Sequence, residues 1–125
     1  MKKILIVEDD KYFSSDLAEL LEFEGIDSIV KNSADEFWPE LNNLDSYDAI
    51  LLDIMMRKGE NLASKSDGET GELLYKEIRS RNKNIKVIVL SAKNKNEISL
   101  NFNKPNVCYL AKPLSGSLDE LLELL

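Results

Sequence analysis

The chain has 125 residues, of which 43% are hydrophobic and 31% are charged, so it suits one domain with one buried core and is not a disordered chain. Its 23 acidic residues outnumber 16 basic ones, and the net charge of −7 argues against direct binding of this domain to DNA or RNA. The absence of histidine excludes histidine-based catalysis and histidine metal sites, and a single cysteine suits a reduced, cytoplasmic protein. No apolar run is long enough to span a membrane.

Short apolar runs predict five strands, and the amphipathic segments between them predict helices. Continuous runs of aliphatic residues are typical of strands buried on both faces of a parallel sheet. The alternation therefore predicts an α/β fold, a doubly wound parallel sheet with helices on both faces, in one domain over residues 1–125. The strands are expected at residues 4–7, 26–30, 49–52, 87–90 and 107–110.

The expected helices carry recognisable start and stop signals. Asp10 is placed to cap the first helix, and Gly25 to end it. Ser33 or Asp35 starts a brief second helix. The third helix runs from about residue 71 to Arg81, a weak fourth lies within residues 96–102, and the last follows Ser115 or Ser117 and continues to residue 125.

Polar side chains follow four of the five predicted strands. Glu8 and Asp9 follow the first strand, Asp53 the third, Ser91 the fourth and Lys112 the fifth. The carboxyl ends of parallel strands form one edge of a sheet, so these groups are expected to converge there. Clustered carboxylates repel one another unless a cation balances them, and an all-oxygen site suits Mg²⁺. A carboxylate in such a site can accept a phosphoryl group, whose oxygens the metal, an ammonium and a hydroxyl would bind.

Four short segments surround these positions: residues 3–10 (KILIVEDD), 52–56 (LDIMM), 89–92 (VLSA) and 109–113 (YLAKP). In this order, they resemble the receiver domain of two-component response regulators, and the resemblance covers essentially the whole chain. It implies a flavodoxin-like five-stranded sheet of order 2-1-3-4-5. It also implies a bacterial, cytoplasmic signalling protein that is a switch rather than a turnover enzyme on an external substrate.

The resemblance assigns a role to each acidic residue. Asp53 would accept a phosphoryl group from a phosphohistidine on a sensor histidine kinase or a phosphotransfer protein. Asp9 and Asp53 would bind Mg²⁺ directly, Glu8 would bind it through water, and the backbone carbonyl of Met55 would be a further ligand. Asp10 is expected to act only as a helix cap.

The resemblance also implies how the switch would work. Ser91 and Lys112 would contact the phosphoryl oxygens, and Tyr109 would turn inward when Ser91 moves. The Lys112–Pro113 bond would be a cis peptide that aims the lysine into the site. The face around the fourth helix and the fifth strand would then change and receive a partner, an output domain or a second copy of the chain.

The chain departs from the family pattern beside the acceptor. Arg57 follows Met56 where the family usually has a proline, and the Arg57–Thr70 loop, which ends at Gly71, is roughly ten residues longer than is usual. Such a loop is expected to gate access to the acceptor or to contact a partner. Lys93, two residues past Ser91, is expected to be solvated or to affect the lifetime of the phosphoryl group.

Three other functions are compatible with parts of the pattern. A degenerate receiver would act as a protein-interaction adaptor without phosphorylation. A hydrolase of the haloacid-dehalogenase type would need a second aspartate where Met55 stands. A flavin-binding flavodoxin-like module is disfavoured because acidic strand ends would repel the flavin phosphate.

Overall fold

The computed structural model describes residues 2–64, 68–112 and 118–125 of the chain. Its sheet is entirely parallel, with the order β2-β1-β3-β4-β5, which confirms the predicted topology. Each observed strand overlaps its predicted range, and no strand end differs from the predicted one by more than one residue. The strands are β1 (Lys3–Val7), β2 (Asp27–Lys31), β3 (Ala49–Asp53), β4 (Lys86–Ser91) and β5 (Val107–Ala111).

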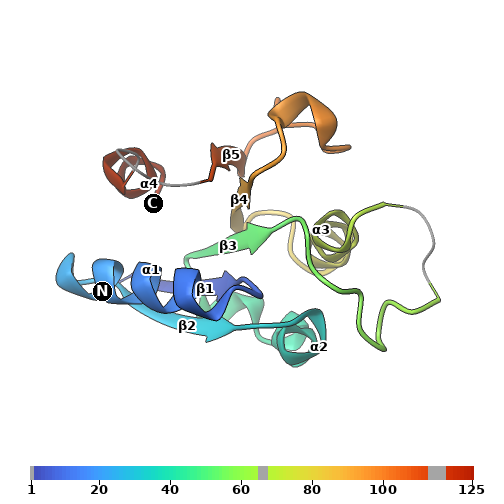
Figure 1. Cartoon of the computed structure of the whole chain (residues 1–125), viewed down its shortest axis with the longest axis horizontal. Helices are drawn as coiled ribbons and strands as arrows, with labels where there is room; N and C mark the ends of the chain where they lie inside the picture. Colours follow the sequence, from blue (N-terminus) through green and yellow to red (C-terminus); the bar gives the residue numbers. More distant parts are fainter. Residues whose placement is uncertain (1, 65–67, 113–117) are drawn as a thin grey trace.

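Helices cover both faces of the sheet. In Figure 1, α1 and α4 lie on one side of the strands, and α2 and α3 lie on the other. Among the described residues, no helix has the length and apolar character needed to cross a membrane. The α-helices are α1 (Lys11–Phe23), α2 (Ala34–Phe37), α3 (Thr70–Arg81) and α4 (Leu118–Leu124), and the 3₁₀ turns are η1 (Trp38–Asn42), η2 (Leu44–Ser46) and η3 (Lys95–Glu97).

Capping side chains explain where the first two helices begin. The Asp10 carboxylate accepts hydrogen bonds from the backbone N–H groups of Tyr12 and Phe13, at 3.1 and 3.0 Å. The Ser33 hydroxyl accepts one from the Glu36 N–H at 3.0 Å, so Ser33 rather than Asp35 caps α2. Both caps satisfy N–H groups that have no partner within the helix. Ser115 and Ser117, expected near the start of the last helix, lie outside the described residues.

The helix expected within residues 96–102 is wrong as a prediction, because this segment contains only the single turn η3, which ends at Glu97. The apolar side chains of the segment explain the difference. Ile98 is buried, and Leu100 and Phe102 pack against the same core cluster at a spacing of two residues. Side chains two positions apart do not share a helix face, so a regular helix could not pack all three against this cluster.

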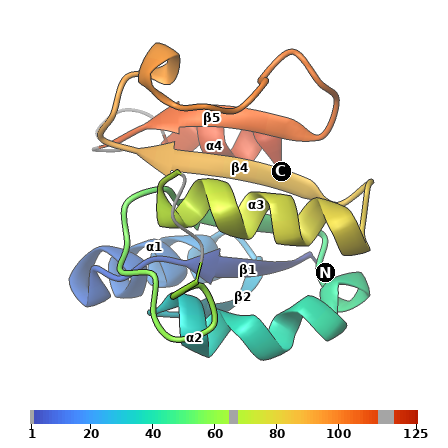
Figure 2. The ribbon, with the colours of Figure 1, turned by 90° about the vertical axis from the view of Figure 1, so that its right-hand side faces the viewer.

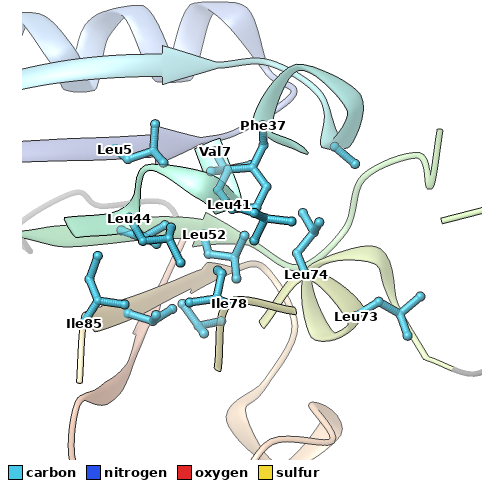
Figure 3. Close-up of a cluster of buried hydrophobic side chains, with 14 of the residues drawn as sticks. Leu5, Val7, Phe37, Leu41, Leu44, Leu52, Leu73, Leu74, Ile78 and Ile85 are labelled. Atoms are coloured by element: carbon cyan, nitrogen blue, oxygen red, sulfur yellow. The ribbon is translucent and has the colours of Figure 1, made fainter. Parts of the chain in front are cut away.

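The core consists of two layers, one on each side of the sheet. Alternate residues of β1 point to opposite faces: Leu5 and Val7 join the cluster under α2 and α3, while Ile4 and Ile6 join the one under α1 and α4. Figure 3 shows the first of these clusters, in which side chains from the strands meet those of the two helices. The sheet is thus buried on both faces, as the continuous apolar runs predict.

The long loop after β3 is attached to the domain rather than projecting freely. Leu62 is fully buried in the core cluster under α2 and α3. The Asp35 carboxylate, on the first turn of α2, accepts hydrogen bonds from the backbone N–H groups of Glu60 and Asn61 at 2.9 and 3.1 Å. In Figure 2, the chain after β3 passes α3 and reaches α2. We call residues 57–64 the anchored loop segment.

Gly71 allows the returning chain to pack closely against the end of β3. Its N–H donates a hydrogen bond to the Ile54 carbonyl at 2.9 Å. A Cβ atom at this position would collide with the backbone of Asp53 and Ile54. The first turn of α3 therefore lies directly beside the strand end that carries Asp53, which is where the candidate site is found.

Candidate functional site

Three carboxylates meet at the carboxyl edge of the sheet. Val7 of β1 pairs with Leu52 of β3. Glu8 follows Val7 and Asp53 follows Leu52, so the two carboxylates come from neighbouring positions at the ends of adjacent strands. Carboxylate oxygens of Glu8, Asp9 and Asp53 all lie within 4.8 Å of one another. The convergence expected from the strand ends is therefore present in the fold.

The three carboxylates differ in their exposure to solvent. Glu8 and Asp53 are buried, at 1% and 5% exposure, whereas Asp9 is exposed. A buried carboxylate is costly unless a cation or hydrogen bonds compensate for lost hydration. The site thus has a buried acidic pair and one acidic group at its mouth.

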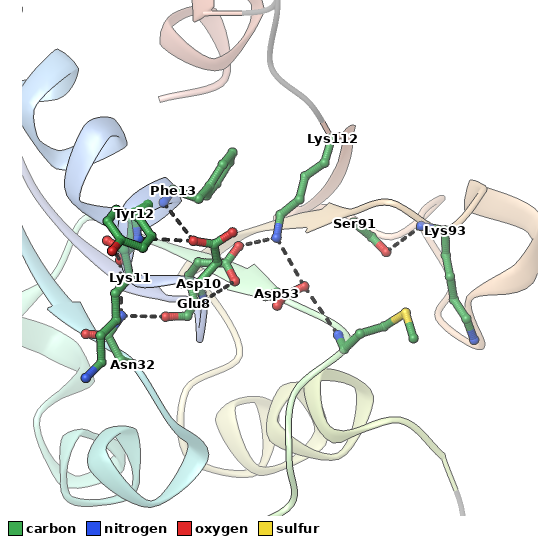
Figure 4. Close-up of polar contacts among 12 residues, drawn as sticks. Glu8, Asp10, Lys11, Tyr12, Phe13, Asn32, Asp53, Ser91, Lys93 and Lys112 are labelled. Carbon is green, nitrogen blue, oxygen red and sulfur yellow. Dashed lines mark hydrogen bonds and ion pairs between the residues drawn. The ribbon is translucent and has the colours of Figure 1, made fainter.

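Lys112 supplies the compensating positive charge. Its Nζ atom forms an ion pair with Glu8 Oε1 and lies 3.5 Å from Asp53 Oδ1. The ammonium also lies 4.7 Å from the centre of the Phe13 ring, a cation–π contact with the first turn of α1. Figure 4 shows the lysine side chain reaching from the end of β5 toward both carboxylates.

This arrangement changes the acidity of the buried pair. Burial, together with the hydrogen bond and negative charge of Glu8, raises the pKa of Asp53 to about 7. Burial also opposes the charged form of Glu8, but its hydrogen bonds with Lys112 and Asp53 lower the pKa of Glu8 below its ordinary value. One lysine thus does not fully balance the carboxylates, and a bound divalent cation would relieve the remaining repulsion. The ligand atoms are all oxygens, and the exposed Asp9 leaves the site open to water, which suits Mg²⁺ because this ion usually keeps several bound waters.

Ser91 lies on the strand next to Asp53. Leu90 pairs with Asp53 across β3 and β4, so the following residue, Ser91, is at the same edge. Its side chain is fully buried, and its hydroxyl accepts a hydrogen bond from the Lys93 N–H at 3.0 Å. The Tyr109 hydroxyl donates to the carbonyl of the same Lys93. Lys93 therefore connects the two predicted switch residues, and its ammonium pairs with Glu69 at 3.3 Å.

Two further predictions concern Met55 and Pro113. The Met55 N–H donates a hydrogen bond to Asp53 Oδ1 at 3.3 Å, which orients the carboxylate, while the role of its carbonyl as a metal ligand stays a prediction. Met55 is half exposed beside the acceptor. Pro113 lies outside the described residues, and so does the predicted cis bond.

Sequence reasoning missed Asn32, which supports the site from β2. Its side-chain amide donates hydrogen bonds to the Glu8 carbonyl at 2.7 Å and to the Ser14 hydroxyl at 3.1 Å. The amide thus ties the end of β1 to α1 and helps to fix the position of Glu8. Asn32 follows β2 directly, so the strand-end argument applied to that strand would have found it. Phe13, above Lys112, had no comparable signal because it also fits the buried stripe of α1.

Comparison with known families gives a match along nearly the whole chain. The family model described as "Response regulator receiver domain" matches residues 4–125. Among solved structures, a CheY-like receiver domain protein from Methanospirillum hungatei JF-1 superposes with a TM-score of 0.76 and 25% identity, covering 98% of this chain and 92% of that one. The receiver domain of the Francisella response regulator 1452 gives 0.75 and 32% identity, covering 99% and 93%.

Curated relatives match over a shorter stretch. The transcriptional regulatory protein CpxR of Escherichia coli (strain K12) is 47% identical over 58 residues, which is 46% of this chain and 24% of that protein. A CpxR homolog from Haemophilus influenzae is 36% identical over 93 residues, covering 74% of this chain and 35% of the relative. The matches thus span only about a quarter to a third of these relatives' lengths.

Proposed function

The chain belongs to the response regulator receiver domain family, and from this premise we propose that it is a phosphorelay switch whose phosphoryl acceptor is Asp53. The observation that carries this proposal is the placement of the Asp53 carboxylate between two other carboxylates and the Lys112 ammonium. The donor would be a phosphohistidine of a sensor histidine kinase or of a phosphotransfer protein.

In the proposed reaction, an oxygen of the Asp53 carboxylate forms a bond to phosphorus as the bond between phosphorus and the donor's imidazole nitrogen breaks. The electron pair of that bond stays with the imidazole, which takes up a proton from solvent. The product is an acyl phosphate on Asp53. Such a transfer depends on positioning and on neutralising charge at the phosphoryl oxygens rather than on a protein base.

The residues around Asp53 would each serve this transfer. Asp9, Asp53 and the Met55 carbonyl would hold Mg²⁺, with Glu8 acting through water, and the ion would supply positive charge for the phosphoryl oxygens. Lys112, which already contacts both buried carboxylates, would add a second positive charge. The Ser91 hydroxyl would donate a hydrogen bond to a phosphoryl oxygen.

The same contacts suggest how phosphorylation would change the surface. When the Ser91 hydroxyl turns to the phosphoryl group, it gives up its hydrogen bond from the Lys93 N–H. Tyr109 is held by the carbonyl of Lys93, so its ring would be released to turn inward. The change would alter the face around η3 and β5, where an output domain or a second copy would dock. A bacterial cytoplasmic location stays a prediction that rests on family membership.

The proposal is tested by incubating the protein with acetyl phosphate and Mg²⁺ and measuring its intact mass. We expect a gain of one phosphoryl group that requires Mg²⁺ and is abolished by Asp53→Asn. Asp16→Asn, on the exposed face of α1, is the matched control and should keep the gain. No gain in the unsubstituted protein would favour the adaptor alternative, for which the complete set of Asp9, Asp53, Ser91 and Lys112 gives no support.

A further inference from the structure

A pocket lies at the opposite end of the strands from the acidic site. It has a volume of about 450 Å³ and is bounded by the C-terminal half of α3 and the segment that leads into β5. Lys83 precedes β4 and Lys104 precedes β5, so the pocket is at the amino ends of these strands. In Figure 2, the end of α3 and the chain entering β5 both lie on the right-hand side.

The charged residues that line this pocket are all basic. They are Lys76, Arg79, Lys83 and Lys104, in a chain whose acidic residues outnumber its basic ones 23 to 16. The C-terminus of a helix favours cations, which is sufficient to explain basic residues near the end of α3. It does not explain Lys104, which comes from a different segment and faces the same hollow.

Arg79 is held rigidly in this pocket without a negative partner. Its guanidinium donates hydrogen bonds to the carbonyls of Ile85 and Asn106, both at 2.7 Å, and to the Tyr75 hydroxyl at 3.1 Å. These acceptors are all neutral, and no ion pair joins Arg79 to a carboxylate in the described part of the chain. The arginine is therefore a fixed positive charge whose orientation does not depend on a bound ligand.

Like Arg79, the three lysines of the pocket have no carboxylate partner among the described residues. Within the described residues, none of them has an ion pair or a side-chain hydrogen bond, and Lys76, Lys83 and Lys104 are all exposed. Tyr75 and Pro105 give the hollow an apolar wall. Converging positive charge beside an apolar wall is the chemistry that binds a phosphorylated small molecule.

We propose that this pocket binds a small anion that carries at least two negative charges, as in a polyphosphate group. The volume suits a small molecule rather than a macromolecule, and the net charge of −7 would repel a nucleic acid backbone. The proposal is independent of phosphorylation at Asp53, because the pocket shares no residue with the acidic site.

The test is calorimetric titration with sodium tripolyphosphate in a Mg²⁺-free buffer of low ionic strength. We expect saturable binding that the double substitution Lys83→Ala/Lys104→Ala weakens about tenfold or more, the equivalent of at least one charge-assisted contact. The control Lys2→Ala/Lys11→Ala removes the same charge from exposed positions outside the pocket and should change the affinity by less than about twofold. All four lysines are exposed, so both double variants should fold.

Two results would overturn the proposal: no saturable heat with the unsubstituted protein, or equal weakening in the two double variants, which would indicate a general effect of charge. Titration with ATP and with adenosine then identifies what is recognised. Binding of ATP but not adenosine, lost in the Lys83→Ala/Lys104→Ala variant, would support an anion pocket. Equal binding of adenosine and ATP would contradict it.

Discussion

The Lys112 ammonium stabilises two buried carboxylates through contacts that no other described lysine makes. Breaking a buried ion pair by removing one partner leaves an uncompensated charge, which costs more than an exposed pair contributes. The contact with Glu8 is therefore expected to matter for folding as well as for phosphoryl binding.

We predict that Lys112→Met lowers the free energy of unfolding by roughly 3 kcal/mol at neutral pH without metal, because Glu8 loses its counter-charge. The measurement is urea denaturation followed by the fluorescence of Trp38. Lys2→Met, at an exposed position, is the control and should change stability by less than about 0.5 kcal/mol. Equal losses in the two variants would show that the ion pair contributes nothing to folding.

Gly59 and Gly25 form a natural pair for testing the loop. Both have a positive φ, of 71° and 75°, but a Cβ on Gly59 would lie 2.5 Å from the Asp35 carboxylate, whereas one on Gly25 would meet nothing within 4 Å. We predict that Gly25→Ala costs about 1 kcal/mol from backbone strain and Gly59→Ala about 2 kcal/mol, since the latter also displaces Asp35. Urea denaturation of both variants measures the difference. Equal losses in the free energy of unfolding would mean that the contact of Asp35 with the loop does not stabilise the protein.

The residues of the site were predictable to the extent that they stand at strand ends. Glu8, Asp53, Ser91 and Lys112 each follow or end an apolar run, and parallel topology brings such positions together. Glu72 had no such signal. It is buried in the first turn of α3, and its carboxylate accepts a hydrogen bond from the Ser99 N–H at 2.7 Å, a contact between positions 27 residues apart. Pairings across irregular segments have no periodicity from which to predict them.

At the scale of elements, the anchored loop segment is attached to the first turn of α2. The sequence predicts a long loop but not its attachment, because Leu62 is one apolar residue among polar ones and Asp35 resembles an ordinary first-turn acid. These contacts hold Glu60, Asn61 and Leu62 in place, while gating of the acceptor and contact with a partner both stay predictions.

The attachment should depend on pH through Asp35. The N–H groups of Glu60 and Asn61 hold the pKa of the Asp35 carboxyl below its ordinary value of 3.8. Because the folded pKa is lowered, the carboxylate stabilises the attached loop above pH 3.8 and this contribution is lost as the pH falls through the lowered value. We predict that the NMR signals of the Glu60 and Asn61 amides titrate together with a midpoint below 3.8. Asp35→Asn should abolish that titration, and a midpoint at or above the ordinary value would contradict the hydrogen bonds.

The segment after β4 shows the limit of reading helices from composition. Its polar residues and scattered apolar ones favoured a weak helix, but Ile98 is buried, and Leu100 and Phe102 pack partly buried against the same cluster from an irregular segment. The decisive information was the spacing of the apolar residues, which is two rather than three or four. The neighbouring Asn94 and Glu97 side chains stabilise only the single turn η3.

At the scale of the whole molecule, an acidic cluster and a basic pocket lie at opposite ends of the strands. The clustered carboxylates of Glu8, Asp9 and Asp53 lie at the carboxyl ends of the strands, and the basic pocket lies at the amino ends of β4 and β5. The parallel α/β class was predictable because apolar runs alternate with amphipathic segments, whereas the strand order came from the resemblance to receiver domains. The distribution of lysines was not, since surface charges carry little information about the fold.

We predict that Mg²⁺ raises the melting temperature of the protein. A ligand that binds only the folded state adds about 2.7 kcal/mol at a hundred times its dissociation constant, which is roughly 8–10 °C for a domain of this size. Sodium chloride of equal ionic strength is the control for screening of the net charge. Asp9→Asn should reduce the Mg²⁺ effect, and an equal rise with both salts would contradict a specific metal site.

The interior position of β1, between β2 and β3, has a consequence for how the chain reaches this structure. Ile4 pairs with Ser28 and Ala49, so β1 has neither of its partner strands until the later residues of β2 and β3 have been synthesised. All its pairings close long loops, and parallel sheets gain no early hairpin to offset that entropy. During translation, the apolar residues 4–7 therefore stay exposed and unpaired until β2 and β3 have been made. Refolding of the pure protein should be slower than that of a helical bundle of equal length.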